Sequence, residues 1–571
     1  MTDKHVDYET DVLIIGAGGA GLRAAIAAND SGNKVTVVTK SLLGKAHTVM
    51  AEGGIAASLG NLDSKDSWEV HFNDTFVEGV YISNWKMAEL LAKEAPERVI
   101  ELEKYGALFD RTPEGKISQR AFGAHTYRRL CHVGDRTGLE IIKTLEDQVL
   151  HRDIVFFDEL YITKILKKDE KVIGAIGLKL NSGEFYVFRA KAVIIATGGC
   201  GKIYKVTSNS WESTGDGLGL AFNAGAELMD MEMIQFHPTG MVYPPGVKGL
   251  LVTEGVRGDG GILLNSQGER YMLRYSPKKK ELDARDIVAR ANYAEIMAGR
   301  GTPHGGVYLD ITHKGADYIK TKLPSMYAQF KDFAGVDITK EKMEVAPTVH
   351  YQMGGIKVDP ETTKTNVEGL FAAGEVASGL HGANRLGGNS LADILVFGRR
   401  SGLGAGGYAR DKKLETVNPP DVDTEIARVK SFLREGGKNP YDIIESLSAN
   451  MSDNVGIIRN EENLEKALKN LQDLKLQVPS VSVGGNLKYN KGLLACLELP
   501  NMIIAAEAVI RGALMRKESR GAHARSDYPK KDPNFRKNII YTKIGNDMKL
   551  ELRPVPEMPD EIKKLVDPEE Y

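Results

Sequence analysis

Residues 11–40 read DVLIIGAGGAGLRAAIAANDSGNKVTVVTK and predict the start of a dinucleotide-binding fold. The apolar run Val12–Ile15 predicts a buried parallel strand, and Gly16, Gly18 and Gly21 follow it with the spacing GxGxxG. The first glycine allows a tight turn, the second lets the backbone approach a pyrophosphate, and the third lets the next helix pack closely on the strand. The N-terminus of that helix would point free N–H groups at phosphates.

The residues that follow complete a βαβ unit. Leu22–Asn29 predicts the helix, Gly32 ends it, and Val35–Val38 predicts the second strand. That strand is followed by Thr39 and Lys40, where an NAD site usually has an acidic residue for the ribose. The missing acid argues against an ordinary NAD site.

One histidine, His47, stands a loop beyond this strand, shortly before the flexible pair Gly53 and Gly54. Imidazole is a nucleophile, so a histidine held against a flavin ring can become covalently attached to it. A lone histidine is more often a hydrogen-bonded structural residue, so this interpretation needs support from the rest of the chain.

The composition of the chain limits which kinds of binding partner can be expected. With 571 residues the chain should form several domains, and its net charge of -2 gives no indication of nucleic acid or of a charged membrane surface. Cys131, Cys200 and Cys496 are far apart, so we expect no disulfide framework, no CxxC redox pair, no metal site and no iron–sulfur cluster held by this chain. The polar N-terminus and the lack of about 18 consecutive apolar residues predict neither a signal peptide nor a membrane span.

The pattern of elements predicts a split α/β domain. Helical patterns cover Trp85–Tyr105 and Leu139–Leu150, and residues 234–349 are rich in proline and polar turns, which favours a separate, smaller domain. Residues 411–520 are mainly amphipathic and helical, and the proline-rich tail 521–571 is expected to wrap around other domains. Strands are predicted at Ile154–Phe157, Lys171–Leu180 and Glu184–Lys191 as an inserted meander, then at Ala192–Thr197 before Gly198 and Gly199, and at Gly369–Glu375.

A second GxGxxG match occurs at residues 402–407. The segment before it, Ser390–Arg400, is better interpreted as a helix than as a strand, and no βαβ continuation follows. We therefore do not predict a second nucleotide site.

Seven short motifs, in order along nearly the whole chain, resemble the flavoprotein subunit of succinate dehydrogenase and fumarate reductase. They are HTVMAEGG (47–54), QFHPTG (235–240), TEGVRG (253–258), RD (285–286), HY (350–351), HGANRLGGNS (381–390) and ESRGAH (518–523).

The resemblance implies a C4 dicarboxylate substrate, succinate or fumarate. Such a ligand needs cations and neutral donors at both ends, which His237, Thr253, His350 and Arg385 supply. In the family, residues at these positions bind the two carboxylates, and the residue matching Phe122 packs near the substrate.

Oxidation of a C–C single bond also needs a proton acceptor. Residue chemistry alone favours a histidine, because arginine rarely titrates. The resemblance instead implies Arg285 as the acid–base group, with Glu254 and Arg257 relaying the proton. The alternative is that Arg285 only clamps a carboxylate.

The resemblance further implies FAD attached covalently through His47, which makes a flavin more oxidising. Gly16, Gly18 and Gly21 should hold the pyrophosphate, and Glu375 should lie near the ribityl chain or phosphates. Further residues expected at the cofactor are Thr39, Lys40, Thr48, Gly53, Gly54, Thr197, Gly198, Asp216, Ser390 and Leu391.

The implied fold is α/β: a Rossmann-like FAD-binding domain (1–233 and 350–410) split by an inserted α+β capping domain (234–349), then a helical domain (411–520) and a C-terminal domain (521–571). The implied partners are a membrane anchor, which exchanges electrons with quinone, and an iron–sulfur protein subunit. The implied location is cytoplasmic, peripheral on the inner face of the cell membrane through those partners.

Alternatives remain. L-Aspartate oxidase shares the fold and the segment 516–521, but it binds FAD without a covalent bond and needs a glutamate where Phe122 stands. A disulfide reductase lacks support because there is no cysteine pair, and a flavin-binding protein without turnover would not need the full polar set. The physiological direction of the reaction stays open. Glu52 stands at a position where this chain resembles fumarate reductases, and an added anion near a flavin would lower the reduction potential of the flavin.

Overall fold

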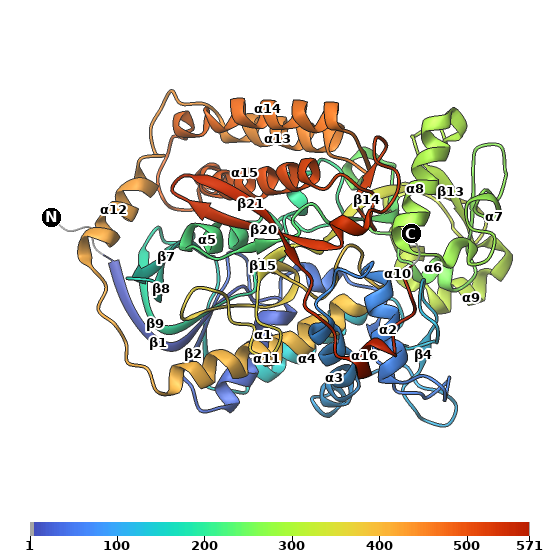
Figure 1. Cartoon of the computed structure of the whole chain (residues 1–571), viewed down its shortest axis with the longest axis horizontal. Helices are drawn as coiled ribbons and strands as arrows, with labels where there is room; N and C mark the ends of the chain where they lie inside the picture. The colour runs from blue at the N-terminus through green and yellow to red at the C-terminus, as the bar shows by residue number, and fades with distance from the viewer. Residues whose placement is uncertain (1–4, 570–571) are drawn as a thin grey trace.

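The central element is a seven-stranded sheet with the order β6-β2-β1-β9-β8-β7, in which β16 also pairs with β9. The computed structural model describes residues 5–569 (Figure 1). Strands β6, β2, β1, β9 and β16 run parallel, and β7 and β8 are antiparallel. Their bounds are β1 (His5–Ile15), β2 (Val35–Val38), β6 (Ile154–Phe157), β7 (Leu160–Lys168), β8 (Lys171–Lys179), β9 (Phe185–Ile195) and β16 (Leu370–Ala372). The predicted βαβ start of the chain is confirmed.

Two strand predictions were wrong. The segments Glu184–Lys191 and Ala192–Thr197, predicted as separate strands, form the single strand β9. Its first half pairs with β8 and its last residues pair with β16, so one strand has two neighbours on the same side. No turn residue interrupts the segment, and this explains why it continues. The meander also begins with a strand that was not predicted, β7, whereas Ile154–Phe157, predicted to belong to it, is β6 and pairs in parallel with β2 at the other edge of the sheet.

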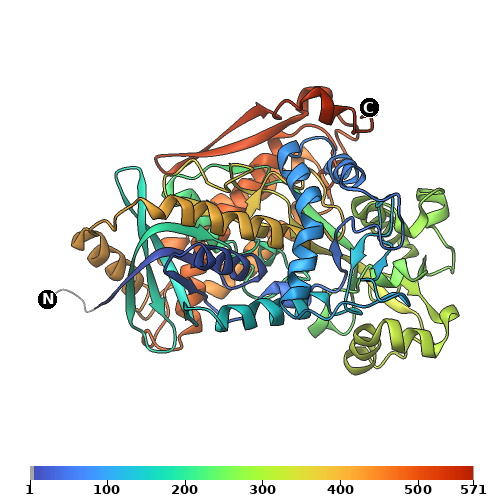
Figure 2. The same ribbon diagram turned by 90° about the horizontal axis from the view of Figure 1, so that it is seen from below.

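Helices α1 (Gly19–Asp30) and α11 (Asn389–Arg410) lie side by side across the sheet (Figure 2). The second GxGxxG match lies inside α11, as the helical interpretation required. A Cβ atom added to Gly402 would lie 2.2 Å from the carbonyl oxygen of Ala24 in α1. Gly402 therefore serves close helix packing, and the match inside α11 does not form a second nucleotide loop.

Residues 234–352 carry their own sheet, β11-β14-β13-β12, and their own apolar core (Figure 1, right). Its strands are β11 (Ile234–Met241), β12 (Ile262–Leu264), β13 (Val307–Asp310) and β14 (Met343–Gln352), and its helices are α6 (Gly255–Gly258), α7 (Met272–Tyr275), α8 (Arg285–Glu295), α9 (Ala316–Lys322) and α10 (Pro324–Ala334). This arrangement shows the inserted α+β cap, while the residue boundaries of the domains remain a prediction.

The helical region contains α12 (Pro419–Lys430), α13 (Pro440–Asn454), α14 (Glu461–Lys475) and α15 (Lys491–Met515). By length and composition α15 is apolar enough to cross a membrane, although Glu498, Glu507 and Arg511 interrupt its apolar residues. However, 78% of its most apolar 18-residue stretch is buried inside the protein, so α15 is a core helix of the part of the chain that the structure describes.

The tail packs on earlier parts of the chain. Strand β20 (Lys537–Ile544) pairs with β21 (Asp547–Pro554) and with β10 (Leu228–Met229), and Ile562 in α16 packs beside Phe72. The remaining elements are α2 (Trp68–Glu78), α3 (Trp85–Lys104), α4 (Thr137–Leu150), α5 (Asp216–Ala224), α16 (Asp560–Lys563), β3 (Ile55–Ala56), β4 (Gln119–Arg120), β5 (Leu130–Cys131), β15 (Gly355–Lys357), β17 (Ala377–Ser378), β18 (Ile458–Arg459) and β19 (Ala524–Arg525).

Candidate active site

One long cavity, with about 1510 Å³ of empty space including its open mouth, extends from the glycine-rich loop to the capping sheet. Almost every residue predicted to bind ligand lines it. These are Gly16, Gly18, Thr39, Lys40, His47, Thr48, Gly53, Gly54, Phe122, Thr197, Gly198, Asp216, His237, Thr253, Glu254, Arg285, His350, Glu375, Arg385, Ser390 and Leu391. Gly21 and Arg257 lie behind the wall.

The glycine-rich loop has the predicted shape. Gly16 adopts φ +113°, and a Cβ atom there would lie 2.3 Å from the carbonyl oxygen of Ala196. A Cβ atom on Gly21 would lie 1.9 Å from the carbonyl oxygen of Gly16, so Gly21 permits the contact between helix and strand. The loop itself faces the cavity, with Gly18 at the start of α1.

The charges at the end of β2 are already paired. The Lys40 Nζ donates to Asp216 Oδ2 at 2.6 Å, to Glu498 Oε1 at 2.6 Å and to Thr214 Oγ1 at 2.8 Å. The Tyr161 hydroxyl donates to the other oxygen of Asp216. Lys40 and Asp216 thus form part of the wall as an ion pair, and sequence reasoning identified neither Tyr161 nor Glu498.

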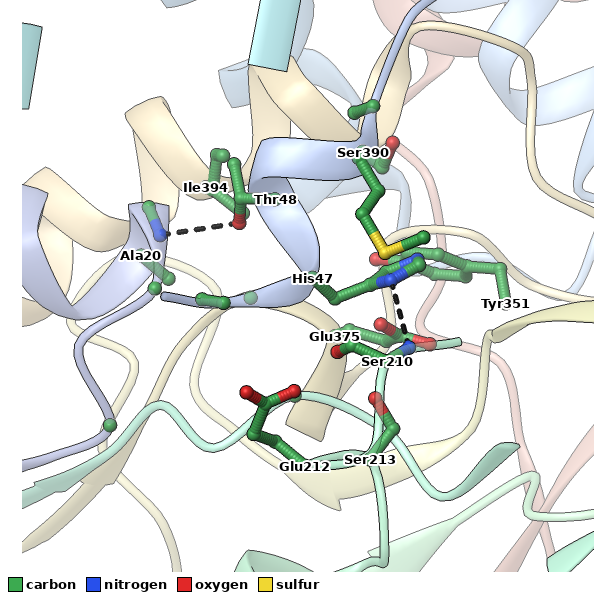
Figure 3. Close-up of a pocket in the computed structure, with 18 of the residues that line it drawn as sticks. Ala20, His47, Thr48, Ser210, Glu212, Ser213, Tyr351, Glu375, Ser390 and Ile394 are labelled. Carbon is green, nitrogen blue, oxygen red and sulfur yellow. Dashed lines mark hydrogen bonds between the residues drawn. The ribbon is translucent and has the colours of Figure 1, made fainter. Parts of the chain in front are cut away.

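His47 lies in the wall midway along the cavity (Figure 3). The backbone N–H of Ser210 donates to its Nδ1 at 3.3 Å, and the amide nitrogen of Asn209 lies 3.3 Å from its Nε2. Burial, with Arg385 and Lys202 nearby, lowers the pKa of His47 to about 4. The ring is therefore a neutral imidazole near neutral pH, with a lone pair available for bonding.

Thr48 and Glu375 are fixed in the cavity wall by hydrogen bonds to backbone N–H groups. The Thr48 hydroxyl oxygen accepts from the backbone N–H of Gly19 at 3.3 Å, which links the loop of His47 to the phosphate loop (Figure 3). Glu375 Oε1 accepts from the backbone N–H of Gln352 at 3.0 Å, and burial raises the pKa of Glu375 to about 7.

At the capping end the cavity wall is rich in donors. Arg385 Nη1 donates to Ser390 Oγ at 2.9 Å, and its guanidinium lies 4.4 Å from the centre of the Tyr351 ring. The rings of His237 and His350 lie 5.0 Å apart. Burial, and next the positive charge of Arg285, lower the pKa of Arg385 to about 9. Burial and neighbouring cationic residues also hold the pKa values of both histidines well below the ordinary value.

Arg285 lies where the cap meets the cavity. Its Nε donates to Glu254 Oε2 at 2.8 Å, and its Nη1 donates to Gln235 Oε1 at 3.2 Å. Arg257 Nη2 lies 3.6 Å from the same Glu254 oxygen. Burial alone would raise the pKa of Glu254, but the Arg285 and Arg257 guanidiniums outweigh it and hold that pKa at about 2. The predicted trio is contiguous, with Arg257 behind Glu254.

Two glycines admit the ring of Phe122. A Cβ atom on Gly53 would lie 2.8 Å from the ring, and one on Gly387 would lie 2.6 Å from it. The Arg285 guanidinium is 5.9 Å from the ring centre. Phe122 therefore forms an apolar wall between the flexible glycine pair and Arg285.

Sequence reasoning missed the wall residues Tyr351, Ser210 and Glu212, and also Gln235, which lies behind the wall and accepts from Arg285. Gln235 and Tyr351 lie inside the family motifs, so their position beside an assigned residue was a usable signal. Ser210 and Glu212 lie just before the segment 214–217, and nothing in their local pattern indicates a site.

The wall contains buried polar atoms that find no partner within residues 5–569. They are Thr197 Oγ1, Ser210 Oγ, Glu212 Oε2, Glu52 Oε2 and Arg385 Nε. Such atoms are costly unless a bound molecule or water satisfies them. The cavity is therefore suited to a long polar ligand at the glycine loop and an anion at Arg385.

Comparisons with known proteins agree. A family model described as FAD binding domain matches residues 11–391, and one described as fumarate reductase flavoprotein C-term matches residues 444–565. The chain is 49% identical to a fumarate reductase (CoM/CoB) subunit of Methanothermobacter marburgensis, covering 93% of this chain and 97% of the relative. It is 40% identical to the succinate dehydrogenase flavoprotein subunit of Coxiella burnetii, covering 95% and 96%.

A solved structure described as Mycobacterium smegmatis Sdh1 in complex with UQ1 superposes with a TM-score of 0.87 at 52% identity, covering 97% of this chain and 95% of that one. Fold and site together define an FAD-binding oxidoreductase. The chain belongs to the family of flavoprotein subunits of succinate dehydrogenase and fumarate reductase.

The cavity fits the flavin that this family binds. The glycine loop at α1 suits the pyrophosphate. Thr197 Oγ1 and Ser210 Oγ, which have no partner within residues 5–569, can form hydrogen bonds to polar groups of the cofactor. The predicted family, enzyme class and FAD are confirmed.

Proposed function

We propose that this chain interconverts succinate and fumarate. The observation that carries the proposal is that one cavity joins a dinucleotide loop to a buried guanidinium, Arg385, which makes no ion pair within residues 5–569. A buried cation without a counter-ion is costly, and a substrate carboxylate would supply the missing charge.

The substrate-binding roles follow from the donor set. One carboxylate would lie at Arg385 and His350, and the other would lie at His237 and Thr253. Carboxylate binding favours the imidazolium form of each histidine, because the new negative charge opposes the burial that now keeps the rings neutral. Phe122 would exclude water from the reacting carbons and, as an apolar ring, gives no counter-charge for the amino group of aspartate.

Bound FAD supplies the hydride acceptor or donor in this chemistry. Arg285 would carry the proton. Its Nε and Nη1 are used by Glu254 and Gln235, whereas its Nη2 makes no hydrogen bond within residues 5–569 and faces Phe122 and Gly387. Glu254, held ionised between two guanidiniums, would pass the proton between Arg285 and Arg257.

The direct test is turnover by the flavin-loaded protein. Succinate should reduce an artificial dye, and a reduced dye should drive conversion of fumarate to succinate. Release of peroxide with L-aspartate, without succinate activity, would instead establish an aspartate oxidase.

The proposal includes covalent attachment of FAD through His47. The backbone donor at Nδ1 supports this linkage, because Nδ1 would remain the acceptor nitrogen of the ring. Nε2, beside the Asn209 amide, would exchange its hydrogen for a bond to a flavin carbon, with the oxidised flavin taking up the two electrons released. Acid-denatured protein run on a gel should show a fluorescent band under ultraviolet light, and His47→Ser should abolish the band. Yellow flavin released from the wild type by acid would rule out the linkage.

Electrons must then leave through another protein or a small acceptor. No group of three metal-ligating side chains occurs within residues 5–569, and the related structure is named for a complex with UQ1. We include in the proposal a membrane anchor, which reacts with quinone, together with an iron–sulfur subunit. These partners would place the chain peripherally on the inner face of the cell membrane. The relative named for CoM/CoB makes those two compounds the alternative electron donors. Quinone reduction by the isolated chain would argue against the partner subunits.

A further inference from the structure

A chain of side-chain hydrogen bonds leads from Arg285 away from the cavity. Arg285 Nη1 donates to Gln235 Oε1, and Gln235 Nε2 donates to Asn384 Oδ1 at 2.8 Å and to the carbonyl oxygen of Arg385 at 2.9 Å. Asn384 Nδ2 then donates to Glu78 Oε1 at 2.7 Å and to Asp286 Oδ1 at 2.9 Å.

Each amide in this chain has one satisfactory orientation. Both hydrogens of the Asn384 amide face acceptors, so its oxygen is left to accept from Gln235. Both hydrogens of the Gln235 amide are also used, so its oxygen must face Arg285. Rotating either amide would put an oxygen against two acceptors. The carboxyl groups of Glu78 and Asp286 at the far end therefore fix the donor-to-acceptor direction along this whole series of hydrogen bonds.

The two carboxyls differ in their surroundings. Asp286 also accepts from Arg290 Nη2 at 2.7 Å, so it is ion-paired. Glu78 ends α2, and the carboxylates of Asp286, Asp283 and Glu254 face it, with Lys279 as the nearby cation. Burial, and next Asp286, raise the pKa of Glu78 well above its ordinary value. Ionised or protonated on its other oxygen, Glu78 accepts the hydrogen of Asn384.

We propose that Glu78 is a positioning residue for Arg285, acting through Asn384 and Gln235; this rests on the acid–base role proposed for Arg285. Without Glu78 one Asn384 hydrogen loses its acceptor, and Asp286 alone then opposes rotation of the amide. When Asn384 rotates, its NH₂ group faces the NH₂ group of Gln235, and within residues 5–569 the carbonyl oxygen of Arg385 alone then keeps Gln235 Oε1 toward the guanidinium. Glu254 still holds Arg285, but the orientation of Nη2 toward the substrate would be less precise.

The test compares three variants of the flavin-loaded, complete enzyme, with rates divided by flavin content. Glu78→Ala should lower kcat about tenfold, within the roughly hundredfold that misplaced groups cost, with KM changed less than about twofold. Glu78→Gln keeps an oxygen acceptor and should retain the wild-type kcat. Glu78→Asp shortens the side chain and should fall between them.

Malonate, a dicarboxylate that cannot be dehydrogenated, provides a readout without turnover. Its Kd, measured from the change in flavin absorption, should be the same in all variants, because Arg385 and the histidines are untouched. An unchanged kcat in Glu78→Ala, or an equal loss in Glu78→Gln, would overturn the proposal. If Glu78→Ala does not fold, wild-type kcat in Glu78→Asp overturns it instead. A wild type without succinate or fumarate turnover refutes the proposed function itself.

Discussion

The tail of the protein buries an arginine–glutamate cluster and the cavity buries the guanidinium of Arg385, and the two places differ in whether the guanidinium has a counter-charge. In the tail cluster, Arg516 Nε donates to Glu232 at 2.6 Å and its Nη2 donates to Asp230 at 3.2 Å. Burial would lower the pKa of Arg516, but Glu232 and Asp230 outweigh it and raise that pKa above its ordinary value. In the cavity, Arg385 is equally buried but has no carboxylate partner within residues 5–569, and its pKa falls to about 9.

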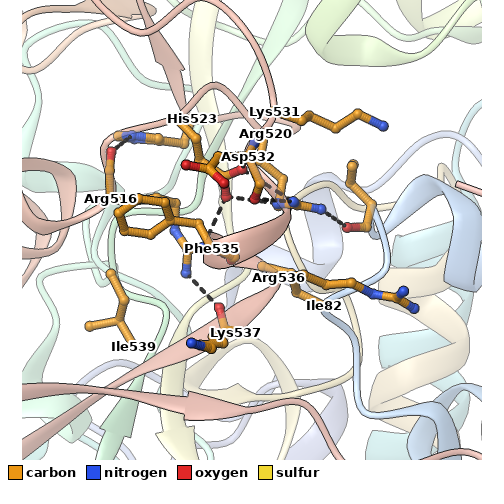
Figure 4. A network of polar contacts seen from close by, with 12 residues as sticks. Ile82, Arg516, Arg520, His523, Lys531, Asp532, Phe535, Arg536, Lys537 and Ile539 are labelled. Atoms are coloured by element: carbon orange, nitrogen blue, oxygen red, sulfur yellow. Dashed lines mark hydrogen bonds and ion pairs between the residues drawn. The ribbon is translucent and has the colours of Figure 1, made fainter. Parts of the chain in front are cut away.

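The difference separates structure from function. Both arginines expose no more than 2% of their surface, so burial does not distinguish them. What distinguishes them is the paired charge: Arg520 and Glu518 extend the tail cluster into a network in which each guanidinium meets a carboxylate (Figure 4). Because Arg385 is buried, lacks a carboxylate partner within residues 5–569 and also lines the cavity, it is a suitable place for an anionic ligand.

The largest expected effect is in the tail cluster. Arg516→Met leaves Glu232 and Asp230 buried without a cation, so the free energy of unfolding should fall by roughly 3–5 kcal/mol. Denaturant unfolding of the flavin-loaded chain measures this. In Arg516→Met/Glu232→Gln one uncompensated carboxylate is removed, and part of the loss should return. Equal stability of the wild type and Arg516→Met would remove the distinction between the tail cluster and Arg385.

Arg385→Met should have the opposite profile. Removing the unpaired cation should leave thermal stability unchanged or higher, because it relieves an uncompensated buried charge. The value of kcat/KM for succinate should fall by roughly a hundredfold to a thousandfold, since a desolvated charge pair with the substrate is lost. Steady-state kinetics and a melting curve on the same preparation check both. A strongly lowered melting temperature would mean that Arg385 is structural.

The stabilisation that Glu254 gains from its two guanidinium neighbours should depend on pH. Its folded pKa of about 2 lies below the unfolded value, so its stabilising contribution is present above about pH 4.5 and is lost as pH falls toward 2. The shift corresponds to about 3 kcal/mol. Unfolding free energy followed against pH should decline less steeply over that range in Glu254→Gln than in the wild type. Parallel curves would show that the two guanidiniums do not stabilise the carboxylate.

The smallest effect is expected at Glu52. Sequence reasoning treated it as an anion near the flavin, but burial, and next Asp135, raise its pKa well above the ordinary value, against the opposing effect of Arg120. Arg120 donates to the backbone carbonyl of Glu52 and makes no hydrogen bond to its carboxyl group. A neutral acid differs from glutamine by about one hydrogen bond, about 1 kcal/mol, so Glu52→Gln should shift the two-electron flavin potential by about 20 mV. Spectroelectrochemical titration of both proteins measures it, and a shift several times larger would show that Glu52 is ionised.

Local patterns predicted the parts of the fold that depend on backbone chemistry. The strand, glycine turn and helix at Val12–Asp30 could be predicted because sterics permit few residue types there. The absence of a turn residue within β9 was a usable signal of its continuity, but its two partners, β8 and β16, could not be predicted, because they come from segments that lie almost 200 residues apart.

The candidate site shows the same limit. The sequence identified Arg285, Glu254 and Arg257 by resemblance, and the structure brings them together. Nothing in the sequence pointed to Glu78, which lies outside every family motif and reaches Arg285 only through two amides. Pairing also could not be foreseen: Lys40 was predicted at the cofactor, and its charge is satisfied by Asp216 and Glu498.

The contact between α1 and α11 has a mechanical consequence. Gly398 and Gly402, four residues apart, meet Ala20 and Ala24, which have the same spacing, so the two helices touch along a seam of small residues with almost no side chain between them. Such a seam has little to compress or shear. The phosphate loop before α1 and Ser390 at the start of α11 are thereby kept at a fixed separation. The cofactor end of the cavity should therefore act as a rigid reference, and movements that admit substrate are expected at the cap.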